Sequence, residues 1–332
     1  VGENKAGDYV FARDLKVEGC MAALLKDAVK PNLVQTLEGT PAIVHGGPSA
    51  NIAHGCNSIL ATYAAMGLSD YVVTEAGFGA DLGAEKFLDT KCRVAGIQPD
   101  CVVVVATVKA LKLHGGADKA DLARENLDAL EKGLPNLFKH IENMKNVYNK
   151  PVVVAMNRFA SDTPAKIAAV MRAVEAAGAT AVFTDVFLKA GEGGRELAET
   201  VVKAAEQKSE LKYSYDLSDP IKKKIEDIVV RVYGGAGVEF SETASEKIAE
   251  AEARGYGKLP VIVAKTQYSL SDDPKLLARP EKFIVRVRDI IVKGGAEFVV
   301  AVAGNIMLMP GLSKHPAAEK IDIDGNGEIT GL

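Results

Sequence analysis

From about residue 40 onward, short apolar runs alternate with longer stretches in which apolar residues recur at helical spacing. Short apolar runs bounded by polar residues or glycine are typical of buried strands, and a period near 3.6 is typical of amphipathic helices. Residues 101–106 are apolar at every position, which favours a parallel strand covered on both faces. The pattern predicts an α/β fold. We expect strands at 42–44, 71–74, 101–106, 152–156, 181–184, 261–264, 283–292 (one face wet) and 297–303, and helices near 51–65, 80–95, 120–147, 164–177, 195–207, 219–231 and 242–254.

The alternation predicts two α/β units behind a helical first segment. Residues 1–41 have no catalytic signature, and Lys30-Pro31 breaks their helical pattern. A long amphipathic helix ends near 147–150, where a second strand–helix series opens with Pro151. We therefore expect one unit at 42–147 and another at 148–332.

Composition places the chain among ordinary soluble globular proteins. Its 332 residues are 48% hydrophobic and 25% charged, enough for two domains with real cores. The net charge of -4 gives no electrostatic reason to expect nucleic acid, and the cluster Lys222-Lys223-Lys224 is interpreted as a solvated helix face. No apolar run is long enough for a membrane span. The four cysteines lack metal-binding spacing, which favours reduced thiols and a cytoplasmic location.

Polar residues follow the predicted strands at their C-terminal ends. A strand has to end in something polar, and this ordinary explanation suffices for any single position. Several such residues beside glycine-rich turns favour a shared ligand-binding edge, because ligands of parallel sheets bind at the carboxyl ends of the strands. The residues are His45, Glu75, Thr107, Asn157, Asp185, Lys265 and Asn305.

Two of these strand ends, at His45 and Glu75, lead directly into glycine-rich turns. Glycines let backbone N–H groups approach a ligand, and the N-terminus of a following helix favours an anion. Glu75 stands at a predicted strand end beside Gly77 and Gly79, where a carboxylate can hold a metal ion or an attacking group. Helix capping is the ordinary alternative for Glu75.

Three other motifs have a plainer interpretation. His45 and His54 lack a helical metal spacing and an evident third ligand, so histidines that line a polar pocket are favoured over zinc. Residues 322–329 resemble the first half of an EF-hand loop, but no helix precedes them and the glutamate of its twelfth position does not follow. A hairpin with Asn326-Gly327 as a two-residue turn is favoured there.

Asn157 and Asp162 follow a predicted strand, loosely like the base-reading turn of GTPases. A GTPase also needs a phosphate loop of the form GxxxxGKS or GxxxxGKT, and no such segment occurs in the 332 residues. The missing loop disfavours a GTPase-like switch.

Taken together, several segments resemble the formate–tetrahydrofolate ligase (formyltetrahydrofolate synthetase) family, and the resemblance extends from residue 1 to residue 332. Family members are longer at the N-terminus, so the resemblance implies a C-terminal fragment without the P-loop and its lysine. The segments are Val44-His45-Gly46-Gly47-Pro48, Ala50-Asn51-Ile52-Ala53-His54-Gly55, Val73-Thr74-Glu75-Ala76-Gly77-Phe78-Gly79-Ala80-Asp81, Asn157-Arg158-Phe159, Lys189 with Gly191-Glu192-Gly193-Gly194, and Lys265-Thr266-Gln267-Tyr268-Ser269.

The resemblance implies a reaction in which ATP, with Mg²⁺, phosphorylates formate to formyl phosphate, which tetrahydrofolate attacks to give 10-formyltetrahydrofolate. It also implies a homotetramer, and a monovalent cation is a further candidate cofactor. The net charge and the lack of a long apolar run predict no nucleic-acid or membrane partner. We expect the intact enzyme to perform this ligation and this chain alone to be inactive. The alternative is a non-catalytic folate- or nucleotide-binding module, or a subunit that works only with a chain bearing the P-loop.

The resemblance assigns the parts of the chain as well. It makes residues 1–41 the tail of an inserted segment, 42–147 part of a P-loop-type nucleotide domain, and 148–332 the domain that contributes the folate slot. Phe187 stands where the family usually has a tryptophan, and the chain has none. On sequence alone, Phe159 and Phe187 could equally be core aromatics. The implied site residues are Glu75 and His45 for catalysis, Glu75 for Mg²⁺, Ala76, Gly77, Phe78, Gly79 and Asn157 for nucleotide, and Phe159, Phe187, Lys189 and Gly191 for folate.

Overall fold

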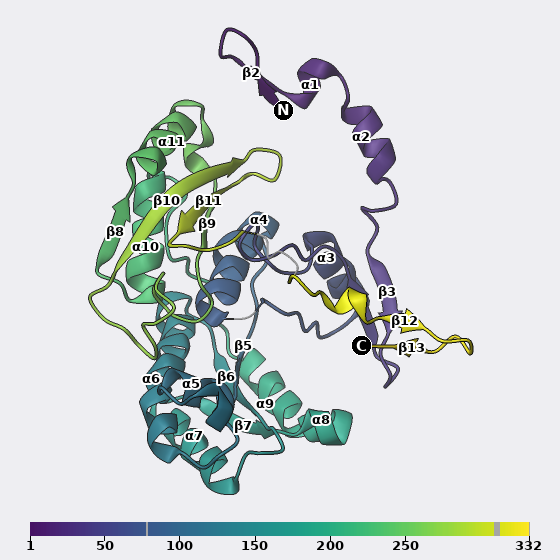
Figure 1. Ribbon diagram of the computed structural model, residues 1–332, viewed down its shortest axis with the longest axis vertical. Helices are drawn as coiled ribbons and strands as arrows, with labels where there is room; N and C mark the ends of the chain where they lie inside the picture. The colour runs from purple at the N-terminus through teal and green to yellow at the C-terminus, as the bar shows by residue number, and fades with distance from the viewer. Residues whose placement is uncertain (78, 309–312, 332) are drawn as a thin grey trace.

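The computed structural model describes residues 1–77, 79–308 and 313–331. Two larger sheets organise these residues (Figure 1). One sheet is parallel and three-stranded, and the other is mixed and four-stranded. Helices connect the successive strands of the parallel sheet, and α11 (Glu242–Ala253) and η7 (Tyr256–Lys258) connect the two outer strands of the mixed sheet. The predicted α/β class is therefore confirmed.

The parallel sheet has the strand order β5 (Val102–Ala106), β6 (Val152–Asn157), β7 (Thr180–Thr184). Valines dominate its strands because β-branched side chains suit the pleated conformation. β6 is buried along its interior, as expected for a central strand. The edge strand β5 was predicted to be covered on both faces, but Val103 and Val105 are exposed. The adjoining helices are α5 (Val108–His114), α6 (Leu127–Glu142), α7 (Pro164–Ala176) and α9 (Arg195–Ala205).

The mixed sheet has the order β8-β10-β11-β9. β10 and β11 form an antiparallel hairpin, and β8 and β9 flank it as parallel strands. The predicted one-sided wetting of β10 is confirmed, because Val285 and Val287 are buried and Arg286 and Arg288 are exposed. The elements are β8 (Gly237–Phe240), β9 (Val261–Ala264), β10 (Ile284–Lys293) and β11 (Phe298–Ala303), with α10 (Ile221–Asp227), the π-helical η6 (Ile228–Tyr233) and α11 (Glu242–Ala253).

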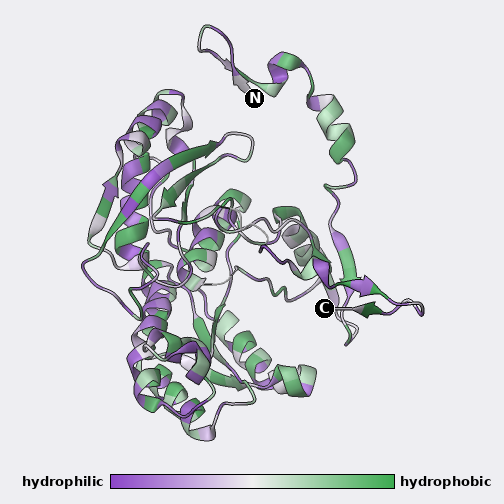
Figure 2. Cartoon of the chain, viewed as in Figure 1, coloured by the Kyte–Doolittle hydropathy of each residue, from purple (hydrophilic) through white to green (hydrophobic). Residues whose placement is uncertain are grey.

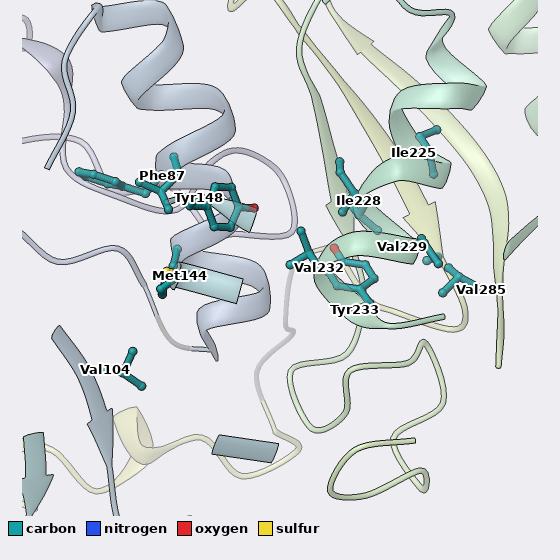
Figure 3. Close-up of a cluster of buried hydrophobic side chains, with 14 of the residues drawn as sticks. Phe87, Val104, Met144, Tyr148, Ile225, Ile228, Val229, Val232, Tyr233 and Val285 are labelled. Atoms are coloured by element: carbon teal, nitrogen blue, oxygen red, sulfur yellow. The ribbon is translucent and has the colours of Figure 1, made fainter. Parts of the chain in front are cut away.

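One hydrophobic core joins the two sheets. It includes Val104 and Met156 from the parallel sheet and Val285 from the mixed sheet. Between them lie Tyr148, at the end of η4 (Asn143–Val147), and Tyr233 of η6, and both rings are fully buried. Figure 3 shows Val104 and Tyr148 on one side of this core and Tyr233 and Val285 on the other. Burial of this shared apolar surface holds the sheets together.

The predicted boundary near 147–150 has to be revised, because it cuts through the parallel sheet. β5 precedes this point and β6 follows it, and the two strands pair in register from Val102↔Val152 to Ala106↔Met156. A helix that ends before a strand looks the same in sequence whether that strand joins the old sheet or a new one. The two units are better divided by sheet than at the end of α6.

The first predicted strands do not join the parallel sheet. β4 (Pro41–Val44) pairs instead with β3 (Asn32–Gln35) in an antiparallel hairpin. Residues 71–74 are not a strand in the described chain, and Val73 is 92% exposed. An apolar run indicates the capacity to pair, but pairing also requires a neighbouring strand with free backbone groups.

The helix predicted near 51–65 begins later, as α3 (Ile59–Leu68). Ser58 is its N-cap, and its Oγ accepts a hydrogen bond from the N–H of Ala61. The helix predicted near 80–95 is present with π-helical turns. It consists of η1 (Gly79–Ala84), η2 (Phe87–Cys92) and α4 (Arg93–Ala95).

The chain ends also differ in detail from the expectation. Residues 1–41 contain β1 (Gly2–Glu3), β2 (Tyr9–Val10), α1 (Ala12–Leu15) and α2 (Glu18–Leu25) before the β3–β4 hairpin, so the segment is only partly helical. The C-terminal hairpin is confirmed as β12 (Asp322–Ile323) and β13 (Ile329–Thr330). Its turn is longer than two residues, because Asp324 accepts hydrogen bonds from the N–H groups of Asn326 and Glu328. None of the described helices combines the length and apolarity of a membrane span.

Gly133 offers a test of the close packing between α5 and α6. A Cβ at Gly133 would lie 1.8 Å from the carbonyl oxygen of Leu111, whereas a Cβ at the exposed helical Gly67 would meet nothing within 4 Å. We expect Gly133→Ala to lower the free energy of unfolding by about 2 kcal/mol or more, because the helices must separate. Gly67→Ala should leave it unchanged or raise it by up to about 1 kcal/mol, because alanine favours a helix more than glycine does. Urea unfolding measures both, and equal effects would show that the helices do not pack this closely.

Candidate active site

The carboxyl ends of the three parallel strands bring several predicted site residues to one edge. Asn157 ends β6 and pairs in register with Thr184, which ends β7. Thr107 follows β5 and caps α5, because its Oγ1 accepts a hydrogen bond from the N–H of Ala110. Thr107, Asn157 and Asp185 therefore lie at one edge, as predicted, because the three strands run in the same direction. Of the other predicted strand-end residues, Lys265 and Asn305 follow strands of the mixed sheet, and His45 and Glu75 follow no strand of either larger sheet.

The loop after β6 presents Phe159 in a fixed position. The N–H of Phe159 donates to Asp162 Oδ2 at 2.8 Å, and the N–H of Asp162 donates to the carbonyl of Phe159 at 2.9 Å. The Phe159 ring is 39% exposed. Lys109 Nζ, from the first turn of α5, lies 4.2 Å from the centre of this ring. The ammonium group contributes a cation–π contact and leaves the ring partly open.

The loop after β7 presents Phe187, Lys189 and Gly191. Phe187 lies on the short helix α8 (Val186–Lys189), and its ring is 90% exposed. Figure 2 shows that hydrophobic residues dominate this helix although it lies on the outside of the domain. Gly191 follows in η5 (Ala190–Gly194), and its N–H donates to Glu38 Oε1 from the β3–β4 turn at 2.8 Å.

The exposure of Phe159 and Phe187 bears on the choice between core aromatics and a binding slot. Neither ring belongs to a hydrophobic core of the described residues, although each follows a buried strand. Exposed aromatic rings cost free energy unless something covers them. Their position on neighbouring loops of one edge therefore favours a slot over the core interpretation.

The two glycine-rich turns lie against each other. A Cβ at Gly77 would be 3.1 Å from the carbonyl oxygen of Gly55, and one at Gly83 would be 1.9 Å from the carbonyl oxygen of Ala76. Gly77 and Gly79 both have φ of +74°, which disfavours any residue with a side chain. Of the residues predicted to contact nucleotide, Ala76, Gly77 and Gly79 are therefore held in one turn, while Phe78 lies outside the described residues.

His45 is held by three hydrogen bonds. Its backbone N–H donates to Asn57 Oδ1 at 3.0 Å, Nε2 lies 2.8 Å from the carbonyl of Ala28, and Nδ1 lies 2.7 Å from Ser58 Oγ. A carbonyl only accepts, so Nε2 carries the proton and Nδ1 accepts from the Ser58 hydroxyl. No hydrogen bond joins His45 to Glu75 among the described residues, and the Glu75 side chain is exposed. The structure does not bring these two residues into contact.

A buried ion pair that the sequence analysis missed fixes the second glycine turn. Lys265 Nζ, just after β9, lies 2.6 Å from Asp81 Oδ2, and both side chains are almost fully buried. Burial opposes ionisation of Asp81, but Lys265 and His140 hold its pKa below the usual range. The sequence places Lys265 at a strand end and in a segment that resembles the family, but it does not indicate which residue Lys265 pairs with. The helical pattern of 80–95 gave no sign that Asp81 points inward.

Glu85 lies one helical turn beyond Asp81 and is also fully buried. Neither of its carboxylate oxygens has a hydrogen-bond partner in the described chain. Burial, and then the charge of Asp89, raise the pKa of Glu85 well above its usual range. Burial also lowers the pKa of its neighbour Lys86 to about 8, although Lys86 Nζ donates to the carbonyl of Ala50 at 2.5 Å. Burial and the lack of hydrogen-bond partners for its carboxylate oxygens thus favour the neutral form of Glu85.

Strand order, glycine turns and exposed rings together define an α/β protein with a candidate ligand-binding edge at its strand ends. A family model described as formate–tetrahydrofolate ligase matches residues 1–332, so the chain belongs to this family. The formate–tetrahydrofolate ligase of Symbiobacterium thermophilum is 57% identical over 332 residues, which is all of this chain and 60% of the relative. The chain thus spans less than two thirds of the length of that relative.

The raised pKa of Glu85 makes a prediction about stability and pH. The folded state holds the Glu85 proton more tightly than the unfolded state, so protonation of Glu85 stabilises the fold. This stabilisation is complete below the ordinary carboxyl pKa and is lost as the pH rises through the pKa of Glu85 in the folded state. Between pH 5 and 7.5, below the Lys86 pKa of about 8, the stability of Glu85→Gln should rise relative to wild type by up to about 1.4 kcal/mol per pH unit. Urea unfolding across this range is the measurement.

The exposed Glu131 provides a control for this experiment. Glu131→Gln should keep the pH dependence of wild type. If Glu85→Gln also keeps it, Glu85 is ionised in the folded protein and its proposed neutral state is wrong.

Proposed function

We propose that the chain carries the tetrahydrofolate slot of an ATP-dependent formate–tetrahydrofolate ligase. The observation that carries this proposal is the pair of exposed rings, Phe159 and Phe187, on adjacent loops of one sheet edge in a member of this family. The proposed reaction passes through formyl phosphate and gives 10-formyltetrahydrofolate. ATP transfers its terminal phosphoryl group to formate and leaves as ADP. An amine nitrogen of tetrahydrofolate then attacks the formyl carbon, the bond from this carbon to the phosphate oxygen breaks, and phosphate and the amine proton leave as the new C–N bond forms.

The slot suits a flat heterocycle with an anionic tail. Aromatic rings stack in offset or edge-on arrangements that add about 0.5–1.5 kcal/mol per pair beyond the area they bury. Lys109 beside Phe159, and Lys189 at the end of α8, provide positive charge nearby. The N–H of Gly191 donates a hydrogen bond to the carboxylate of Glu38, which shows that this N–H can bind a carboxylate. These features match the pterin and the glutamate carboxylates of tetrahydrofolate.

The glycine turn at 75–79 is proposed to contact the nucleotide. Backbone N–H groups near Ala76, Gly77 and Gly79 can approach phosphate oxygens, because no side chains intervene at the glycines. Mg²⁺ in such sites is commonly held by one or two carboxylates together with phosphates and water. The exposed Glu75 carboxylate fits this requirement. When bound, the ion would neutralise charge that develops on the transferred phosphoryl group.

His45 and Asn157 have supporting roles in this proposal. The Nδ1 of His45 accepts from Ser58 and its Nε2–H donates to the carbonyl of Ala28, so the imidazole shapes the first glycine turn and can donate to a small anion only if the contact with Ala28 breaks. Asn157 ends β6 beside the Phe159 loop, nearer in sequence to the folate slot than to the glycine turns. It is therefore proposed to link the two halves of the site.

We further propose that these 332 residues do not phosphorylate formate by themselves. They contain no GxxxxGKS or GxxxxGKT segment to bind the phosphates. The relative that matches the chain has further residues outside the matched 60% of its length. These observations favour a chain that works together with a P-loop supplied from outside these 332 residues.

Phe159 tests the folate slot directly. Phe159→Leu should weaken tetrahydrofolate binding by about ten-fold, since loss of ring stacking removes roughly 1 kcal/mol or more. Phe159→Tyr keeps a ring and should bind within about two-fold of wild type. Isothermal titration calorimetry with tetrahydrofolate measures both, and Mg-ATP is titrated as a separate ligand. Unchanged affinity in Phe159→Leu would show that the pterin does not bind at this ring.

Formate-dependent ADP production tests the need for an outside phosphate loop. The purified 332-residue chain, given ATP, Mg²⁺ and formate, should release ADP no faster than a formate-free control. A coupled assay for ADP is the measurement. Robust formate-dependent turnover by this chain would contradict the proposal that the loop must come from elsewhere.

A further inference from the structure

One ion pair connects the two loops that carry the exposed rings. Arg158 Nη1 lies 2.9 Å from Asp185 Oδ2, and Asp185 is only 4% exposed whereas Arg158 is 32% exposed. Arg158 directly precedes Phe159, and Asp185 stands two residues before Phe187. The ion pair therefore links the two segments that carry the rings.

Backbone hydrogen bonds also hold the segments on both sides of this ion pair. The N–H of Arg158 donates to the carbonyl of Thr184 at 3.2 Å, so the β6–β7 ladder continues up to the ion pair. The N–H of Asp185 donates to the carbonyl of Gly193 at 3.1 Å, and the N–H of Lys189 donates to the carbonyl of Asp185 at 3.0 Å. Asp185 thus anchors both ends of the loop that carries Phe187.

Without the arginine, Asp185 would be a poorly satisfied buried charge. Its second carboxylate oxygen, Oδ1, is buried and has no hydrogen-bond partner in the described part of the chain. A buried carboxylate that loses its counter-ion rearranges toward water or takes up a proton. Either response would move the loop at 185–194, where Ala190 already has a positive φ of 49°.

We infer that Arg158 is a positioning residue, which sets the spacing of Phe159 and Phe187 through its ion pair with Asp185. This inference rests on the proposed folate slot and adds the group that holds its two walls together. Arg158 does not need to touch the ligand for this role. Its planar guanidinium fits a carboxylate better than the single ammonium of a lysine does.

The test combines tetrahydrofolate affinity with a spectroscopic reporter in the purified protein. Phe187→Trp introduces the only tryptophan of the chain and reports the mobility of α8 through its fluorescence anisotropy. In this background we expect Arg158→Gln to lower the anisotropy of the free protein. In the chain with Phe187 intact, it should weaken tetrahydrofolate binding on the order of ten-fold or more. Affinity for Mg-ATP should stay the same, and Arg158→Lys should recover part of the loss.

Arg172 is the matched control, because it is an exposed arginine on the neighbouring helix α7. Arg172→Gln should change neither anisotropy nor affinity. The double variant Arg158→Gln/Asp185→Asn replaces the ion pair by two neutral amides that can hydrogen-bond to each other. Its affinity for tetrahydrofolate should be no lower than that of Arg158→Gln or of Asp185→Asn alone, whichever binds more weakly, because the effects of coupled residues do not add.

The outcomes separate this inference from the proposed function. If wild type does not bind tetrahydrofolate, the proposed function fails, while the fluorescence anisotropy of the Phe187→Trp background still tests the link between the loops. If wild type binds and Arg158→Gln matches Arg172→Gln in both measurements, the inference is overturned alone. Losses in Arg158→Gln that extend equally to Mg-ATP, with a lower melting temperature, would show a general structural role and also overturn it.

Discussion

The helical stretch from Gly79 to Ala95 buries its charged side chains, and the rest of the structure depends on how these charges are satisfied. Asp81 pairs with Lys265, and Asp89 accepts hydrogen bonds from the hydroxyls of Tyr148 and Ser214. Lys91 Nζ donates to Thr62 Oγ1 at 2.8 Å. Removing Lys265 would leave Asp81 as an unpaired buried charge, at a cost of about 3–5 kcal/mol. Each hydrogen bond to a charged group contributes about 1.5–3 kcal/mol, so these contacts fix their segments firmly.

These contacts position the candidate site. The Asp81–Lys265 pair holds the glycine turn that precedes η1 against the end of β9, and Lys91 holds α3. Tyr148, which binds Asp89, lies just before β6 and is part of the core shared by the two sheets. A single buried stretch therefore connects the proposed nucleotide turn to the sheet whose edge carries the proposed folate slot.

Sequence patterns predicted where strands and helices occur better than they predicted which strands pair with each other. The runs at 101–106, 152–156 and 181–184 became β5, β6 and β7, because β-branched residues in a short apolar run have few alternatives. Parallel direction then placed Asn157 and the loops of Phe159 and Phe187 at one edge. The run at 71–74 has the same local character, but its pairing depends on a neighbouring strand, which local pattern does not specify.

Contacts between distant polar residues were beyond the reach of the sequence. Asp81, Glu85 and Asp89 recur at a spacing that is equally typical of a solvated helix face, and only the fold shows that this face is buried. Arg158 and Asp185 were each visible beside a strand end, but their pairing requires β6 and β7 to be adjacent. Exposure of the two rings, which distinguishes a slot from a core, likewise emerges only from the assembled loops.

A structure of the protein in complex with tetrahydrofolate tests the central claim most directly. The account predicts that the pterin lies between Phe159 and Phe187, with ring centroids about 4.5–7 Å apart as in other aromatic contacts. The Arg158–Asp185 pair should remain intact beneath it. A pterin bound elsewhere on the chain, with both rings still open to solvent, would contradict the account.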